Sequence, residues 1–370
     1  MKKIISLLAS SALFISSIGN ATACTAINLQ AADGTVVAGR NMDWFTDMEW
    51  TLEVMPKGSP VLESAPANLN LQATEHSSKY AYAAVAAKIL KDANPVVEGQ
   101  NSNGLGLSGN FLPGFTEYET VTKEDRHYIS IIDLGAYILG MFGTVAEAKA
   151  ELPKYKVWFE PNEVKGLPTP PWLHLVITDR TGASIVVEFV KGHTVIHDNV
   201  SGTLTNAPTY DWHLNNARNY LNLTNMAPLP IKVNGLTATS LGGEGAGMVG
   251  IPGDYSSPSR FVKAAMFQYY ATKPKTSDQA NALVAHLLAT VNLAKGDSIA
   301  KDGGAIVGDH TQWTTIKDLT HNKIKIADYG NLTNFIQVDL NKVWATGKPQ
   351  LWVIKDMPYS PNDLTTQLMK

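Results

Sequence analysis

The pattern of apolar and polar positions predicts a hairpin near the start of the chain. Cys24 to Leu29 and Val36 to Arg40 have strand character and flank the turn Ala32-Asp33-Gly34. Strands separated by tight turns also dominate the middle and the end of the sequence. They are predicted at Trp172 to Thr178, Ser184 to Val190, Thr194 to Asp198, Gly202 to Thr205, Thr311 to Asp318, Lys323 to Ala327 and Phe335 to Asp339. A tight turn at Asn103 to Leu107 leads into a further strand that ends near Asn110, while Tyr80 to Ile89 fits a strand or a short helix.

Apolar residues at helical spacing alternate with these strands. Helices are predicted at Ile129 to Leu139, Val145 to Leu152, Tyr210 to Tyr220, Pro258 to Tyr270 and Asp278 to Leu293. Ser277 precedes the last helix and is expected to cap it. Pro153 to Pro171 and Asn222 to Pro252 are rich in proline and glycine, which predicts ordered loops. No repeat or long linker divides the chain, so we expect one α+β domain over residues 24–370, with sheets packed between helical layers.

The first 23 residues have the pattern of an export signal rather than of folded structure. Lys2 and Lys3 form a positive region, Ile4 to Ile18 an apolar region, and Ala21-Thr22-Ala23 an A-x-A cleavage site. The apolar region is too short to span a bilayer comfortably, and no later stretch reaches the ~20 apolar residues that a span needs. We therefore predict cleavage after Ala23 and a periplasmic or secreted mature protein that begins at Cys24.

A second interpretation of the same segment is a lipoprotein signal, in which Cys24 is acylated and anchors a non-catalytic binding protein to a membrane. Ala21 stands at the position where lipoprotein signals usually carry leucine. No flexible polar tether follows Cys24 before the strand-like residues begin. These features favour the free cysteine, and the anchor stays open as an alternative.

The composition and charge of the chain disfavour nucleic acid and anionic membranes as binding partners. The 370 residues are 44% hydrophobic and 17% charged, with a formal net charge of −3. The charges are scattered, so no basic stripe is available for nucleic acid and no polybasic run for an anionic membrane. A small-molecule ligand is the partner we expect.

The single cysteine of the sequence is the first candidate for chemistry. Exported proteins usually carry cysteines in pairs, so the unpaired Cys24 at a cleavage site suggests a reactive thiol. A terminal α-amine has a pKa of roughly 7.7 to 8, and it would give the thiol its own base. A papain-like protease instead requires an internal cysteine with downstream histidine and asparagine, which disfavours that class.

No metal or cofactor is expected. The nine histidines lack ligand spacing, and no H-E-x-x-H motif is present. His213 is interpreted as a structural residue in a helix. The glycines around Gly242 to Gly250 do not follow a strand in a βαβ unit, which disfavours a phosphate or dinucleotide loop.

Several motifs, in order, resemble the choloylglycine hydrolase and penicillin V acylase family. The resemblance spans nearly the whole chain after the leader. It is carried by Cys24-Thr25, Gly39-Arg40-Asn41-Met42-Asp43, Gly109-Asn110-Phe111, the segment from Leu204 to His213, Gly250 to Asp254, Pro258-Ser259-Arg260-Phe261 and Thr311-Gln312-Trp313-Thr314. It implies an N-terminal nucleophile hydrolase with a four-layer αββα fold, cofactor-free hydrolysis of a linear amide through an acyl thioester, and often a homotetramer.

The resemblance also implies a role for each matching site residue. Cys24 matches the nucleophile, with its α-amine as the proton carrier. Arg40 matches the cation that supports the thiolate, and Asp43 the carboxylate that orients the amine. The remaining matches are Asn206 as the side-chain oxyanion donor, Asn110 as the second oxyanion position through its backbone N–H, and Arg260 as a supporting arginine.

The sequence indicates the class of substrate less clearly than it indicates the family. Trp44 resembles the tryptophan with which Gram-negative penicillin V acylases line the acyl pocket, whereas Asn110 is similar to the bile-salt branch. Trp44, Phe45, Phe111, Trp50 and Leu112 are candidates for an apolar acyl pocket, with plain core packing as the alternative for each. We expect penicillin V-like or long-chain acyl homoserine lactone substrates, and conjugated bile salts as the second choice.

Overall fold

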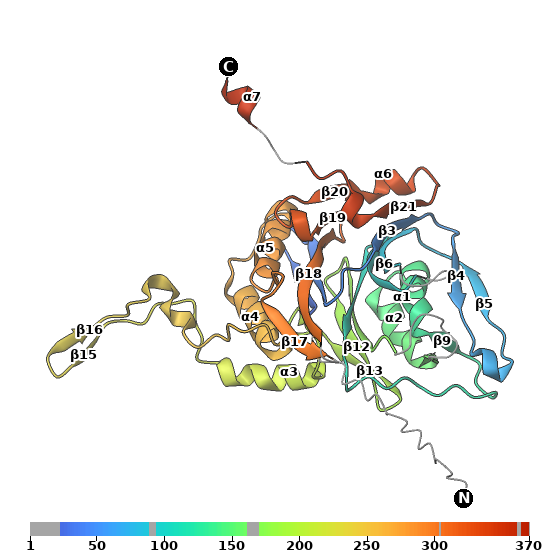
Figure 1. Ribbon diagram of the computed structural model, residues 1–370, viewed down its shortest axis with the longest axis horizontal. Helices are drawn as coiled ribbons and strands as arrows, with labels where there is room; N and C mark the ends of the chain where they lie inside the picture. The colour runs from blue at the N-terminus through green and yellow to red at the C-terminus, as the bar shows by residue number, and fades with distance from the viewer. Residues whose placement is uncertain (1–22, 89–93, 161–169, 303–304, 361–363, 370) are drawn as a thin grey trace, which may run out of the picture.

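Two large antiparallel sheets lie between helical layers in the computed structural model (Figure 1). The structure describes residues 23–88, 94–160, 170–302, 305–360 and 364–369. The predicted leader therefore lies almost wholly outside the described residues and stays a prediction.

The first sheet combines strands from near the start of the chain with strands from near its end. Its strands β1 (Thr25–Gln30) and β2 (Val36–Trp44) form the expected hairpin, with Ala26 opposite Arg40. β18 (Ala305–Asp318) pairs with β2 on the other side. In spatial order the sheet is β14 (Thr203–Leu204), β1 (Thr25–Gln30), β2 (Val36–Trp44), β18 (Ala305–Asp318), β19 (Lys323–Asp328) and β20 (Ile336–Asp339), and β17 (Ser298–Asp302) also pairs with β18.

The second sheet contains the other predicted hairpin, β11 (Leu173–Asp179) with β12 (Ser184–Val190), next to its edge strand β13 (His193–Asp198). In spatial order its strands are β13 (His193–Asp198), β12 (Ser184–Val190), β11 (Leu173–Asp179), β8 (Leu105–Phe111), β7 (Val96–Asn101), β6 (Tyr82–Ala87), β3 (Trp50–Met55) and β21 (Gln350–Val353). Smaller pairs are β4 (Pro60–Glu63) with β5 (Thr74–Ser77), β9 (Tyr128–Ser130) with β10 (Lys156–Trp158), and β15 (Ile231–Val233) with β16 (Leu236–Ala238). Strands β6, β7 and β11 are buried along their whole length, because both faces of this sheet are covered.

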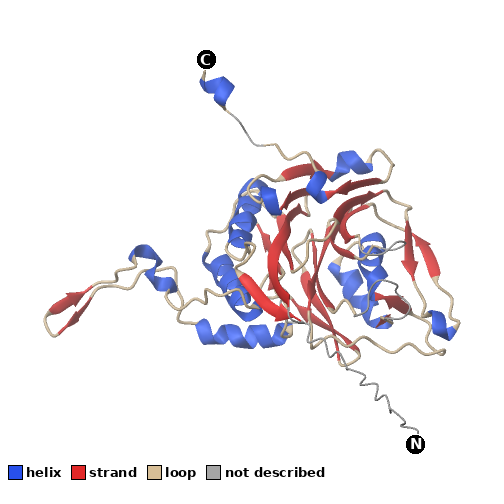
Figure 2. Ribbon diagram, viewed as in Figure 1, coloured by secondary structure: helices blue, strands red, loops and turns tan. Residues whose placement is uncertain are grey.

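Helices close the outer face of each sheet (Figures 1 and 2). The helices are α1 (Ile131–Met141), α2 (Val145–Glu151), α3 (Tyr210–Ala217), α4 (Ser257–Tyr270), α5 (Ser277–Ala289), α6 (Leu340–Trp344) and α7 (Thr365–Leu368). α1 and α2 cover the second sheet, and α4 and α5 cover the first. The order helix, sheet, sheet, helix confirms the predicted α+β fold.

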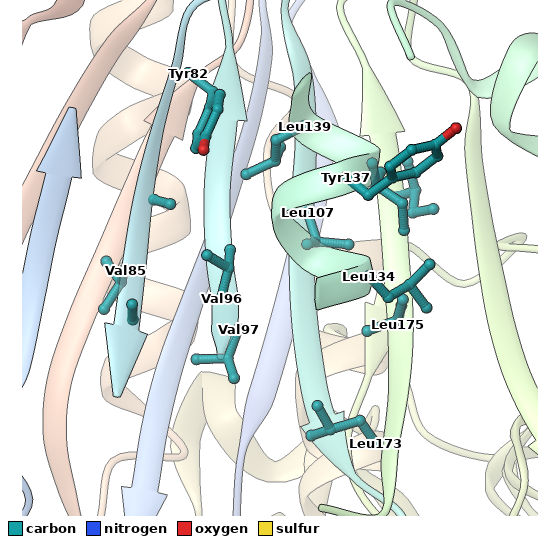
Figure 3. Packing of buried hydrophobic residues seen from close by; sticks show 14 of the residues in the cluster. Tyr82, Val85, Val96, Val97, Leu107, Leu134, Tyr137, Leu139, Leu173 and Leu175 are labelled. Atoms are coloured by element: carbon teal, nitrogen blue, oxygen red, sulfur yellow. The ribbon is translucent and has the colours of Figure 1, made fainter. Parts of the chain in front are cut away.

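The largest hydrophobic core includes the contact of α1 with the second sheet (Figure 3) and extends to Met42 and Trp313 of the first sheet. Leu134 and Leu139 of the helix meet Val96 and Leu107 of the strands. Gly135 allows the close approach, because a Cβ there would lie 2.2 Å from the carbonyl oxygen of Val96. Within the described residues, no helix is long and apolar enough to cross a membrane.

Several predicted element ends need correction. Ile129 belongs to β9, where it pairs with Val157, and the helix begins at Ile131 with Ser130 as its cap. The cap of α5 is Thr276, which accepts a hydrogen bond from the Gln279 amide. Ser277 instead donates its hydroxyl to Asp318 Oδ2 at 2.5 Å, and the helix ends at Ala289 rather than at Leu293.

The two predicted loops contain short elements. β10 lies in the first of them, whose residues 161–169 are outside the described part of the chain. The second holds the β15–β16 hairpin and a 3₁₀ turn at Gly243–Met248. In Figure 1 this second segment projects from the body of the molecule as an arm.

Candidate active site

The Cys24 thiol is buried between the two sheets, at the residue that precedes β1. Its side chain is 1% exposed. Sγ lies 3.6 Å from Met42 Sδ and 3.7 Å from the carbonyl oxygen of Asp43. Burial raises the pKa of the thiol, and the positive charge of Arg40 opposes that rise. In the uncleaved chain the nitrogen of Cys24 is bonded to Ala23, so the residue carries no base of its own.

Arg40 places a fixed cation beside this thiol. It stands on β2, directly across the hairpin from Ala26, and is buried. Its Nη2 donates to Cys24 Sγ at 3.4 Å, and its Nε donates to Asn110 Oδ1 at 3.0 Å. The guanidinium also lies over the ring of Trp313, 5.1 Å from the centroid. A cation held on three sides in this way stabilises a thiolate more than the neutral thiol.

Asp43 contributes a buried carboxyl group to the site, and one of its oxygens has no hydrogen-bond partner among the described residues. Thr311 of β18 stands opposite it and donates its hydroxyl to Oδ1. Oδ2 is buried and has no hydrogen-bond partner among the described residues. Burial raises the pKa of Asp43 to about 7, although Arg260 opposes the rise. The site therefore holds a carboxyl that can accept one more donor.

Asn206 and Arg260 form a second group next to the nucleophile. Arg260 Nη1 donates to the carbonyl oxygen of Cys24 at 2.6 Å and to Thr25 Oγ1 at 2.7 Å. Its Nη2 donates to Asn206 Oδ1 at 2.7 Å. Asn206 Nδ2 donates to the carbonyl oxygen of Phe111 at 2.8 Å, and this leaves its second amide hydrogen available to a ligand.

Asn110 is close to the site, but both of its side-chain amide hydrogens are already used in hydrogen bonds. Nδ2 donates to the carbonyl oxygens of Leu204 and Thr205 at 3.0 and 2.9 Å, and Oδ1 accepts from Arg40. Both amide hydrogens are therefore used to hold the segment that leads to Asn206. The side chain has no hydrogen left for an oxyanion, which agrees with the backbone role that the resemblance implies.

The aromatic candidates separate into two groups. The ring of Trp44 lies 5.2 Å from those of Phe45 and Phe111, and Phe111 lies 5.6 Å from Trp172. These partly buried rings are suited to an apolar ligand group. Trp50 belongs elsewhere: it is buried, packs edge-on against Trp313 and donates Nε1 to Gln312. Leu112 is also fully buried, so both residues fit the core alternative.

A cleft of about 840 Å³ adjoins this cluster. Ala23 and Asn206 are among its lining residues, so the residue before the predicted cleavage site and the predicted oxyanion donor lie at the same opening. Removal of Ala23 would enlarge the cleft next to Cys24. No group of three or more histidine, cysteine, aspartate or glutamate side chains within the described ranges is arranged to hold a metal ion.

Sequence reasoning missed several residues of the site. Met42, Thr311 and Trp313 were within family motifs but had no assigned contact, and the structure places them against Cys24, Asp43 and Arg40 respectively. Asp309 and Trp172 lay outside the motifs. Asp309 stands two residues before Thr311 on β18, and that spacing on a strand was the available signal. His213 lies in a helix, α3, as predicted, and it is buried against Asn206.

The comparison with known families agrees with this geometry. The profile of the linear amide C–N hydrolases, choloylglycine hydrolase family, matches residues 24–343. The chain belongs to this family. The match begins at Cys24, the residue around which the site is built. The predicted family is thereby confirmed, and the protein is an N-terminal nucleophile amidohydrolase of the choloylglycine hydrolase and penicillin V acylase type.

The similar proteins include both bile salt hydrolases and penicillin V acylases. A bile salt hydrolase/transferase of Clostridium perfringens is 28% identical over 319 residues, which are 86% of this chain and 93% of the relative. The structure of a variant of conjugated bile acid hydrolase from the same organism superimposes with a TM-score of 0.80 at 26% identity, covering 92% of this chain and 100% of that one. Penicillin V acylase from Agrobacterium tumefaciens shares the fold, with a TM-score of 0.72 at 22% identity and coverage of 91% and 94%.

Proposed function

We propose that removal of residues 1–23 produces a hydrolase whose nucleophile is the Cys24 thiolate and whose substrates are N-acyl amides of the penicillin V or long-chain acyl homoserine lactone kind. The proposal rests on the buried contact between Arg40 Nη2 and Cys24 Sγ at 3.4 Å, at the residue where the family match begins. A cation in this position favours the thiolate, which is the form that attacks.

The neighbouring groups support a two-step acyl transfer. Once free, the α-amine of Cys24 takes the thiol proton, and Asp43 Oδ2 accepts a hydrogen bond from the amine and orients it. Sγ attacks the substrate carbonyl, and the oxyanion accepts a hydrogen from Asn206 Nδ2. The amine then protonates the leaving nitrogen as the carbon–nitrogen bond breaks, which leaves an acyl thioester. Attack by water, through a second oxyanion, releases the acid and restores the thiol.

The aromatic side chains support the choice of acyl half. The ring of Trp44 lies 5.2 Å from those of Phe45 and Phe111, and the carbonyl oxygen of Phe111 accepts the hydrogen bond from Asn206. Such a set suits a phenoxyacetyl or long alkyl group. Conjugated bile salts are the second candidate, because the Clostridium perfringens relative carries that function in its name and Asn110 resembles the bile-salt branch.

Export to the periplasm or medium is also proposed, on the leader pattern before Cys24. Cleavage by an ordinary signal peptidase predicts a mature mass that begins with an unmodified cysteine. A diacylglycerol on sulfur would instead support the lipoprotein alternative. Intact mass of the protein isolated from cells separates the two.

We further propose a homo-oligomer, tetrameric by the resemblance, in which the projecting arm contributes to the contacts. The arm and its flanks expose large apolar side chains, among them Leu229, Ile231, Val233, Leu236 and Leu241. Exposed apolar groups gathered on one segment are typical of a contact surface. Light scattering on the wild type and on Leu236→Asp tests this, because a charge on the arm is expected to lower the assembled mass.

A hydrolysis panel tests the catalytic proposal directly. Purified protein that begins at Cys24 is incubated with penicillin V, long-chain acyl homoserine lactones and glycine- and taurine-conjugated bile salts, with Cys24→Ala as the matched control. Release of a free amine by the wild type alone supports the amidase and identifies its branch. Equal turnover by Cys24→Ala, or none on any substrate by a folded protein with a free Cys24 amine, would sink the proposal.

A further inference from the structure

One wall of the cleft beside Cys24 is acidic. Asp254, Asp297 and Asp309 all line it, and no lysine, arginine or histidine is among its lining residues in the described part of the chain. Trp44, Phe45 and Phe111 are not among the lining residues either. The aromatic group and the cleft are therefore separate surfaces on which two halves of a substrate can rest.

Asp309 differs from an ordinary surface carboxylate. Its side chain is 1% exposed, and neither Oδ1 nor Oδ2 has a hydrogen-bond partner among the described residues. It lies on β18 two residues before Thr311, so alternation directs both side chains to the same face of the strand. Thr311 bonds Asp43 on that face. The intervening His310 points the other way and contacts Asp47 at 2.9 Å.

Most donors of the two cations near this wall are already used. Arg260 is buried behind the cleft, and its donors go to Cys24, Thr25, Asn206 and Tyr255. Lys263 donates to the carbonyl oxygen of Gly253 at 3.3 Å.

The other two carboxylates of the wall already have donors. Asp254 accepts from the Ser256 amide at 2.9 Å and from the Ser259 hydroxyl at 2.6 Å, and Asp297 accepts from Tyr255 at 3.3 Å. Asp309 is thus the carboxyl of the wall that lacks a donor. A buried acceptor in that state is unfavourable, and a ligand that supplies the donor relieves it.

We propose that Asp309 is a specificity-determining residue that accepts a hydrogen bond from the amine half of the substrate. Through it, the acidic wall selects N-acyl amides whose amine half is uncharged or cationic over those that carry a carboxylate or sulfonate. The inference rests on the proposed amidase function, with the acyl half on the aromatic side chains. It places acyl homoserine lactones, whose amine half is an uncharged lactone, ahead of penicillin V and conjugated bile salts, whose amine halves are anionic.

A matched substrate series separates this charge effect from recognition of the acyl half. The phenoxyacetyl amides of homoserine lactone, agmatine, glycine and taurine share one acyl group and differ in the charge of the amine half, and a decanoyl series repeats the test. We expect wild-type kcat/KM to be about tenfold higher for the lactone and agmatine amides than for the glycine and taurine amides. In Asp309→Asn this ratio is expected to fall toward one.

Control variants keep the test decisive. Asp198→Asn removes an exposed carboxylate on β13, outside the cleft, and is expected to leave the ratio unchanged. If Asp309→Asn does not fold, Asp297→Asn on the exposed part of the wall replaces it and is expected to raise kcat/KM for the anionic amides. Equal wild-type rates on all four amides, or an equal loss on all four in Asp309→Asn, would overturn the inference. Hydrolysis of none of them would instead count against the amidase proposal itself.

Discussion

Arg260 Nη2 lies 2.7 Å from Asn206 Oδ1, and this bond fixes which end of the Asn206 amide faces the ligand. A guanidinium only donates, so the oxygen must face Arg260 and the nitrogen must face the carbonyl oxygen of Phe111. The amide nitrogen, with one hydrogen still free, is therefore held in place before substrate arrives. Such preorganisation is what makes an oxyanion donor effective.

Loss of that donor is the first prediction. Asn206→Ala is expected to lower kcat by about 10² to 10³, the range found when one oxyanion donor is removed. Turnover of the best amide from the hydrolysis panel gives the number. Asn215→Ala, at an exposed position of α3, is the control and is expected to retain full activity. A lower melting temperature with unchanged kcat in Asn206→Ala would return the residue to a structural role.

The second prediction concerns the α-amine. A protein that retains Ala23 has a peptide nitrogen in place of the base, and burial keeps its thiol pKa raised. We expect it to lose at least about 10²-fold in activity relative to the chain that begins at Cys24, and to react more slowly with iodoacetamide. Comparable activity and alkylation rates in the two proteins would mean that another group acts as the base.

The nucleophile provides the third prediction. Cys24→Ala is expected to abolish amide hydrolysis while the fold is kept, because no group remains to form the thioester. Cys24→Ser is expected to be severely impaired, since a hydroxyl is much harder to ionise beside Arg40 than a thiol. Circular dichroism establishes that both variants fold, and mass spectrometry after substrate addition detects the acyl adduct in the wild type. Adduct formation on another residue would contradict the assignment.

The sequence was sufficient to predict the residues that share one local motif or one short range of spacing. The family resemblance implied the roles of Arg40 and Asp43, but the hairpin predicted from the apolar pattern already places Arg40 on the strand that pairs with the one after Cys24. Asn206 and Arg260 were predicted only through the family resemblance, because no local pattern joins β14 to α4. Asp309 was not predicted, since its role depends on a cleft formed by segments that are distant in sequence.

Strand β7 shows why part of the fold escaped prediction. Its residues Glu98 and Gln100 are fully buried, and they interrupt the apolar alternation that marks a strand with one buried face. Glu98 pairs with the buried Lys317 of β18, from the opposite sheet. Polar residues that meet between two sheets look like surface positions in the sequence, and only the tertiary contact explains them.

The close packing of α5 on β2 gives the fourth prediction. A Cβ on Gly39 would lie 2.5 Å from Val284 Cγ1 and 3.0 Å from the carbonyl oxygen of Thr315. Gly39→Ala is therefore expected to destabilise the protein by about 1 to 3 kcal/mol through overpacking, and to lower activity by displacing Arg40. Urea unfolding measures the loss in free energy of unfolding.

Gly253→Ala, where a Cβ meets nothing within 4 Å, is the matched control and is expected to change stability by less than about 0.5 kcal/mol. Equal stability of the two variants would contradict the packing argument.

The final prediction follows from the neutral state of His213. Its ring stacks on Phe261 at 4.7 Å, and Nε2 lies 2.9 Å from the carbonyl oxygen of Asn206. Because a carbonyl only accepts, Nε2 carries the hydrogen, and Nδ1 is left bare and buried with no partner among the described residues. A proton on Nδ1 would bury an uncompensated charge, and burial accordingly lowers the pKa of His213 to about 4 from an ordinary value of 6.5.

The sign of the resulting pH dependence follows from proton counting. Between pH 6.5 and 4 the unfolded chain binds the proton that folded His213 does not, so the free energy of unfolding falls as pH falls through that window. The loss approaches about 3 kcal/mol for this group. His213→Gln, which keeps a donor toward Asn206 but does not titrate, is expected to show a shallower decline in urea unfolding measured from pH 7 to pH 4. The exposed His193→Gln is the control and is expected to follow the wild type. Parallel curves for His213→Gln and the wild type would mean that His213 accepts its proton without cost in the folded state.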